Sequence, residues 1–242
     1  MSTFEKIPHW LGLLLMLSFV APLAAHESPA RASAGRQKVS ALLPLAARYD
    51  LGVADSRGRR HADWYLWREA GRIETANAAA GRNDIWERIG ADDYHYRRIF
   101  HDDRRVVDYT PGEIKTRNAE PDWAKLASVV SPALLDQLKR RAGKTLFDQR
   151  AVRYTGRLEG QNIDLWWLEK AGLPARLQLI RGHQRMTLVL RELHDRAPAA
   201  WPRTSEKGIA DYGLIDAADF GDMESDPFVA RVLQQDGHAH SH

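Results

Sequence analysis

The 242-residue sequence contains no cysteine. Disulfides, thiolate metal sites and cysteine nucleophiles are therefore excluded. The thioether that anchors bacterial lipoproteins through an N-terminal cysteine is excluded as well. Motifs of common enzymes are also missing, because the chain has no G-x-S-x-G, no H-E-x-x-H and no glycine-rich phosphate-binding loop.

One acidic stretch resembles a calcium-binding loop at first sight. Residues 222–226 place an acid at every second position, but Pro227 stands where such a loop needs glycine. No group of residues in the sequence is arranged to support a reaction. We therefore expect a non-enzymatic protein without a catalytic cofactor.

Long apolar runs are confined to the N-terminus. Residues 11–20 form an apolar core, and small residues follow it as far as Ala25. An apolar core of about 7–15 residues before small residues is typical of a secretory signal, whereas a membrane span needs about 20. We predict a signal peptide over residues 1–25, with alternative cleavage sites up to about residue 32, and a periplasmic location. An uncleaved anchor or a buried helix is the alternative.

Charge is distributed unevenly along the chain. Residues 31–205 hold 32 basic and 22 acidic residues, a net charge of +10, whereas residues 206–242 hold 2 and 8, a net charge of −6. Basic surfaces attract phosphate groups. In an exported protein we expect contact with anionic lipid, including peripheral contact with a membrane, rather than with nucleic acid. The alternative is that the acidic segment folds back and neutralises the basic surface.

Two helices are predicted. Residues 37–49 place apolar side chains at helical spacing. Residues 131–142 begin with Ser131 and Pro132, which suit the first positions of a helix, and Gly143 follows as a terminator.

Most other segments show strand patterns. We predict one hairpin from residues 63–68 and 73–75 and another from residues 94–100 and 105–109, whereas residues 83–89 fit a strand or a helix.

Four further strands follow in a row, at residues 150–158, 162–168, 175–180 and 185–193, with connections of hairpin length. Their alternation gives the resulting meander one apolar and one basic-polar face. The apolar face includes Leu165, Trp167, Leu177, Leu179, Met186 and Leu188.

An apolar sheet face needs a cover. The two predicted helices are the available covers, and Leu134 and Leu138 lie on the apolar face of the second. The predicted fold class is therefore α+β, a twisted antiparallel sheet with helices over its concave face.

Several of these segments carry a resemblance to a known family. They are Trp166-Trp167-Leu168, the run from Gly172 to Leu177 with its Gly-Leu-Pro turn, and the hairpins at residues 64–75 and 94–109. Over residues 35–195 the chain resembles the LolA/LolB/RseB superfamily of periplasmic lipoprotein carriers, receptors and envelope-stress sensors.

The resemblance implies a half-open β-barrel whose helices enclose a cavity for acyl chains. It implies binding of lipid, acyl chains or lipoprotein, and contact with another envelope protein, without chemistry. The candidate cavity residues are Leu134, Leu138, Leu165, Trp167, Leu177, Leu179, Met186 and Leu188. The acidic segment at residues 196–236 has no counterpart in a simple carrier.

The last residues, 237–242, contain His238, His240 and His242. Alternating imidazoles can chelate copper, nickel or zinc from a flexible chain. A periplasmic metal-binding accessory protein is therefore the alternative function, and a polar terminus without metal is the alternative interpretation of the histidines.

Overall fold

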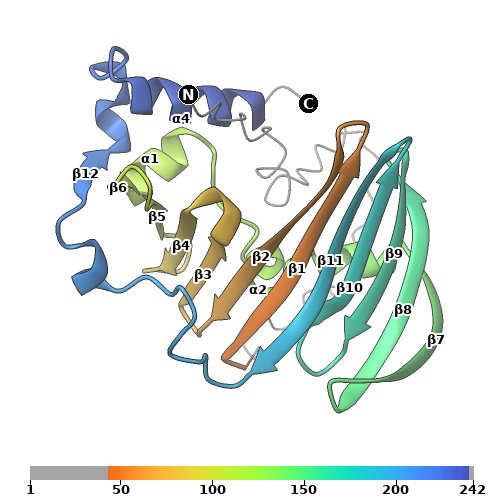
Figure 1. Cartoon of the computed structure of the whole chain (residues 1–242). Helices are drawn as coiled ribbons and strands as arrows, with labels where there is room; N and C mark the ends of the chain where they lie inside the picture. The colour runs from red at the N-terminus through yellow and green to blue at the C-terminus, as the bar shows by residue number, and fades with distance from the viewer. Residues whose placement is uncertain (1–42, 240–242) are drawn as a thin grey trace, which may run out of the picture.

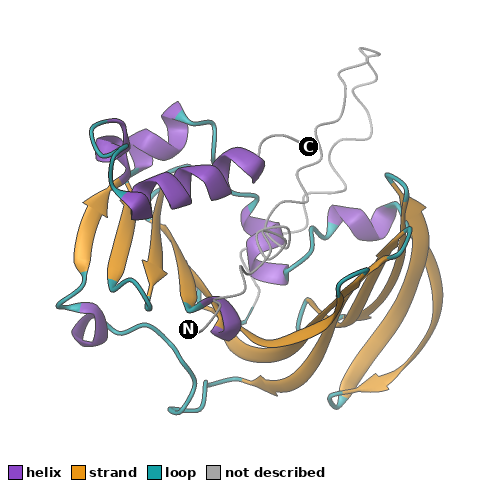
Figure 2. Cartoon of the chain, turned by 45° about the horizontal axis from the view of Figure 1, so that its top comes forward, coloured by secondary structure: helices purple, strands orange, loops and turns teal. Residues whose placement is uncertain are grey.

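The computed structural model describes residues 43–239, and side chains as far as residue 236. Within this range twelve strands form one sheet, in the order β12-β6-β5-β4-β3-β2-β1-β11-β10-β9-β8-β7. All neighbouring strands are antiparallel except β12 and β6, which run parallel. The sheet is bent into an open trough with short helices on its concave side (Figures 1 and 2).

The strands are β1 (Leu45–Asp55), β2 (Gly58–Arg68), β3 (Arg72–Asn77), β4 (Arg82–Arg88), β5 (Tyr94–Phe100), β6 (Arg105–Tyr109), β7 (Lys139–Leu146), β8 (Gln149–Leu158), β9 (Gln161–Leu168), β10 (Leu173–Arg181), β11 (Gln184–His194) and β12 (Gly213–Asp216). The helices are α1 (Pro111–Thr116), α2 (Trp123–Ser128), α3 (Ala133–Asp136) and α4 (Pro227–Ala239), with 3-10 turns η3 (Ala78–Ala80), η4 (Glu206–Ile209) and η5 (Ala217–Gly221).

The predicted fold class is correct only in part. The structure is mostly β, and its mixed sheet does not close into a barrel. The four-strand meander is confirmed as β8 to β11, and both predicted hairpins are confirmed as β2–β3 and β5–β6. The ambiguous segment at residues 83–89 belongs to strand β4.

The helix predicted at residues 37–49 is wrong where the structure describes it, because residues 45–49 begin strand β1. Residues 37–42 lie outside the described part of the chain. Strand β1 lies in the middle of the sheet, and Leu45, Ala46, Ala47 and Tyr49 are all buried. Residues 45–47 are buried on both faces and show no alternation, so this short apolar run matches a helix equally well.

The helix predicted at residues 131–142 is also wrong in its extent. Helix α3 ends at Asp136, and strand β7 starts at Lys139. Strand β7 forms one edge of the sheet and is almost entirely exposed. Basic residues protect an edge strand from further pairing, just as they suit a helix C-terminus, so the composition fits both structures.

The C-terminal part of the chain wraps around the half of the sheet formed by β2 to β6 (Figure 1). Trp201 packs against Trp67 on the convex face, and Ile209 packs in a second cluster with Ile85 and Ile99. Strand β12 then pairs with β6, and helix α4 adds Val232 to the main core on the concave side. Residues 197–232 thus contact both faces of this half-sheet.

Ion pairs attach the acidic segment to arginines of the sheet. Arg97 contacts Glu206 at 2.9 Å, Arg105 contacts Asp226 at 2.7 Å and Arg98 contacts Asp236 at 2.8 Å. The acidic segment therefore folds back onto the basic body, as in the alternative interpretation of the charge pattern.

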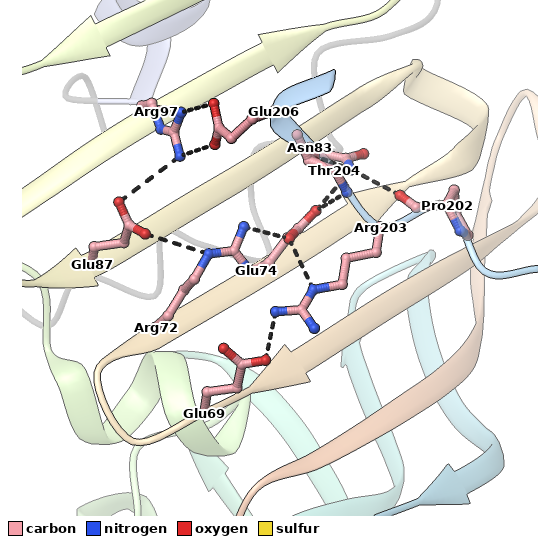
Figure 3. Close-up of polar contacts among 10 residues, drawn as sticks. All are labelled: Glu69, Arg72, Glu74, Asn83, Glu87, Arg97, Pro202, Arg203, Thr204 and Glu206. Carbon is pink, nitrogen blue, oxygen red and sulfur yellow. Dashed lines mark hydrogen bonds and ion pairs between the residues drawn. The ribbon is translucent and has the colours of Figure 1, made fainter. Parts of the chain in front are cut away.

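Glu74 attaches the segment that contains Arg203 and Thr204 to the convex face of the sheet (Figure 3). Its side chain is fully buried, and Oε1 accepts hydrogen bonds from the backbone N–H of Thr204 at 2.7 Å and from Asn83 Nδ2 at 3.1 Å. Its Oε2 lies 2.8 Å from Arg72 Nη2. One carboxylate thus links two strands to the segment that crosses them.

Replacing Glu74 by glutamine is expected to lower the free energy of unfolding by about 1.5–3 kcal/mol, because the buried charge is lost and the amide nitrogen of glutamine cannot accept from Arg72. Chemical denaturation would measure the change. The control is Glu69→Gln, which removes an exposed carboxylate bonded to Arg203 and should cost less than about 1 kcal/mol. Equal effects of the two substitutions would contradict the role of Glu74.

Candidate functional site

A cavity of about 690 Å³ lies on the concave side of the sheet. Strands β2 to β6 form one wall, and the segment that contains α1, α2 and α3 forms much of the other. Short helices lie over the concave side of the trough in Figure 2. The cavity therefore lies between the sheet and its helical cover.

Aromatic rings line the sheet wall. Trp86 on β4 stacks on Tyr96 on β5 with ring centroids 4.1 Å apart, and Tyr96 stacks on Tyr109 on β6 at 5.0 Å. These residues are direct cross-strand partners, so the strand register produces the row. All three residues line the cavity.

One part of the cavity is apolar. Leu126 on α2, Val130 in the following loop and Leu134 on α3 line it. Val130 and Leu134 also border a separate gap of about 10 Å³ against Leu177 and Leu179. The apolar part of the cavity therefore points towards the meander strands β9 and β10.

Another part is charged. Asp84 on β4 is buried and accepts a hydrogen bond from the Tyr96 hydroxyl at 2.5 Å. Arg82 lies 3.0 Å from its carboxylate and Arg98 lies 3.5 Å away. Burial alone would raise the pKa of Asp84, but the two arginines and the hydroxyl outweigh it and lower the pKa, which keeps the carboxylate charged at neutral pH.

Arg98 is the centre of the charged part. Its side chain is only 13% exposed, and its guanidinium lies over the rings of Tyr96 and Tyr109 at 5.5 and 5.9 Å from their centroids. Its Nη1 donates to Asp236 Oδ1 at 2.8 Å, and the Tyr109 hydroxyl donates to Asp236 Oδ2 at 3.4 Å. An aspartate from helix α4 thus reaches the sheet wall.

The eight apolar residues proposed from the sequence all belong to the main core. Leu134, Leu138, Leu165, Trp167, Leu177 and Leu188 are buried, whereas Leu179 and Met186 are partly buried and pack against them. Leu134 lines the 690 Å³ cavity, and Leu134, Leu177 and Leu179 line the small gap. The others pack within the core beside these two spaces.

The histidines proposed as metal ligands cannot be placed in the same way. His240 and His242 lie outside the described residues, and His238 falls in helix α4 at a position whose side chain is not described. In the described part of the chain, no three His, Asp or Glu side chains are arranged to hold a metal ion.

Sequence reasoning missed the charged and aromatic residues of the cavity. A signal was present in strand β5, because every second residue lies on the same face and these residues are Tyr94, Tyr96, Arg98 and Phe100. An arginine in the middle of an aromatic strand face must either reach solvent or find a buried partner. Here it finds Asp84 and Asp236.

Across residues 43–239 no helix combines the length and the apolar character that a membrane crossing requires.

No family model matches the sequence, and no curated protein matches it. Solved structures do show similarity. PNGF-II has a TM-score of 0.40 and 8% identity, over 75% of this chain and 33% of that chain. The chain thus spans about a third of the length of PNGF-II.

Two other solved structures are also similar to this chain. MucB of Pseudomonas aeruginosa, in complex with MucA, has a TM-score of 0.33 and 16% identity, over 65% of this chain and 53% of that chain. A putative outer membrane lipoprotein-sorting protein domain from Vibrio parahaemolyticus has a TM-score of 0.30 and 10% identity, over 69% of this chain and 89% of that chain. The chain resembles both in structure.

Proposed function

We propose that this chain is a non-enzymatic periplasmic protein that binds an acyl chain, either of a free lipid or of a lipoprotein delivered by another envelope protein. The observation that carries the proposal is the 690 Å³ cavity, whose lining combines apolar side chains such as Leu126 and Leu134 with charged ones such as Arg98. Its size lies within the range of roughly 300–1,000 Å³ for small-molecule sites. An amphiphile likewise combines an apolar tail with a polar head.

The residues of the cavity suggest how an acyl chain would lie. Its methylenes would pass along the aromatic row towards Val130 and Leu134. Each buried methylene contributes about 0.8 kcal/mol. Length of the chain, rather than any bond made or broken, would then set the affinity.

A fatty-acid series tests this proposal. We expect each added methylene to tighten binding by about fourfold until the cavity is filled, as its burial energy dictates. Displacement of the apolar dye N-phenyl-1-naphthylamine from the full mature chain would report the affinities. A flat response, together with tight copper or zinc binding that disappears on deletion of residues 238–242, would favour the metal-binding alternative.

A matched pair of variants locates the binding site. Leu126→Trp fills the apolar part of the cavity and should weaken binding of the longest chains by tenfold or more. Leu135→Trp makes the same change at a partly buried leucine of α3 that packs against the core but does not line the cavity. Equal losses in both variants would place the binding site elsewhere.

A further inference from the structure

One end of the cavity already contains a carboxylate. Asp236 lines the cavity from helix α4, whereas the other lining residues come from strands β2 to β6 and from residues 114–137. Its two oxygens accept hydrogen bonds from Arg98 and from Tyr109. The sheet wall therefore presents two donors that hold a carboxylate brought from a different part of the chain.

Both donors are fixed independently of Asp236. Arg98 Nε donates to the Tyr96 hydroxyl at 3.0 Å, and its guanidinium lies 3.5 Å from Asp84 on the same wall. Tyr109 stacks on Tyr96. The two donors would therefore keep their positions if Asp236 moved away.

We propose that Arg98 and Tyr109 form the head-group site for a fatty-acid-like ligand with a carboxylate, and that Asp236 occupies this site when the ligand is absent. The inference rests on the proposed function and names the ligand class. The acidic C-terminal segment then acts as a competitor of the ligand, so binding displaces the Asp236 side chain.

The chemistry of the site favours an anionic head over a neutral one. A carboxylate can replace Asp236 with the same charge and the same two acceptors, whereas a hydroxyl head cannot restore the charge pair. Burial raises the pKa of Tyr109 to about 12, so its hydroxyl keeps the proton that it donates.

The substitution Asp236→Asn tests the inference. It keeps the shape of the side chain and removes the charge that competes for Arg98. We expect the affinity for laurate to rise by roughly tenfold, the value of one charge-assisted hydrogen bond, and the affinity for dodecanol to stay unchanged. Displacement of N-phenyl-1-naphthylamine from the full mature chain measures both, and dodecyl phosphate shows whether a phosphate head is accepted as well.

Asp226→Asn is the matched control. Asp226 also attaches α4, through Arg105 at 2.7 Å, but it does not line the cavity. This variant loosens the helix without removing the competing carboxylate, so laurate binding should stay at the wild-type level.

The outcomes separate the inference from the proposed function. If Asp236→Asn tightens laurate and dodecanol equally, or if Asp226→Asn has the same effect, α4 acts as a steric cover and the head-group assignment is overturned. If laurate and dodecanol bind wild type equally and neither variant changes this, the inference fails while acyl-chain binding stands. If no ligand displaces the dye from any variant, both fail.

Discussion

Replacement of Arg68 by methionine is expected to lower the free energy of unfolding by about 3–5 kcal/mol. Arg68 lies on β2 and is only 2% exposed. Its guanidinium donates to three backbone carbonyls, those of Ala127 at 2.7 Å, Ala171 at 2.8 Å and Leu43 at 3.1 Å. Methionine has an apolar chain and leaves all three carbonyls without this donor. Each buried polar group that loses its partner costs about 1–3 kcal/mol.

The three carbonyls belong to parts of the chain that are otherwise far apart. Ala127 lies in the last turn of α2, Ala171 lies in the β9–β10 turn and Leu43 precedes β1. Burial lowers the pKa of Arg68 to about 10, which still leaves the side chain charged at neutral pH. Its charge also suits the carbonyl end of α2. One side chain thus ties the helical cover to the sheet.

Urea unfolding followed by tryptophan fluorescence would measure the loss. Arg157→Met is the control, because Arg157 is exposed on β8, and its change should be within about 0.5 kcal/mol. Arg68→Lys should give an intermediate loss, since lysine keeps the charge but lacks the planar fork of donors. A methionine variant within 1 kcal/mol of wild type would show that the three carbonyls find other donors.

The Gly-Leu-Pro turn next to Ala171 was only partly predictable from the sequence. Gly172 has φ +61°, so the requirement for glycine at this point was predictable from the hairpin alone. The hydroxyl of Tyr49 donates to the Pro174 carbonyl at 3.0 Å, over a separation of 125 residues. Local turn chemistry predicts the reversal of the chain, but long-range partners of its carbonyls appear only in the fold.

Strand prediction succeeded where one sheet face differs from the other and failed where this difference is lost. In β9, Ile163, Leu165 and Trp167 alternate with Asp164, because the meander has an uncovered convex face. The start of β1, Leu45 to Ala47, is buried on both faces, so the alternation begins only at Arg48 and Asp50 and is short. Composition alone could not separate it from a helix.

The candidate site divides in a similar way. The apolar half of the cavity was partly predictable, since Leu134 was placed on a helix face above the sheet. The charged half depends on Asp236 meeting Arg98 across 138 residues of sequence. An alternating strand face marks Arg98 as unusual, but no local pattern identifies the acid that pairs with it.

Leu177→Ala is expected to lower the free energy of unfolding by about 2–5 kcal/mol, the range for deletion of a large buried side chain. Leu177 is 1% exposed on β10, and its cross-strand neighbours Leu165 and Leu188 are completely buried. It also borders the gap of about 10 Å³ beneath Leu134. Truncation enlarges a space that the surrounding side chains already fail to close, so the upper half of the range is expected.

Denaturant unfolding would measure this loss. Leu214→Ala is the control, because Leu214 on β12 is 71% exposed and its truncation should change stability by less than about 0.5 kcal/mol.

Laurate affinity separates a core residue from a cavity residue. Leu177 does not line the 690 Å³ cavity, so its truncation should leave binding unchanged, whereas Leu126→Trp should weaken binding of long chains by tenfold or more. A loss below about 0.5 kcal/mol for Leu177→Ala, without an effect on binding, would show that this sheet face is not the core. A loss of affinity comparable to that of Leu126→Trp would instead mean that the acyl chain enters the space between α3 and the meander, beyond Leu134.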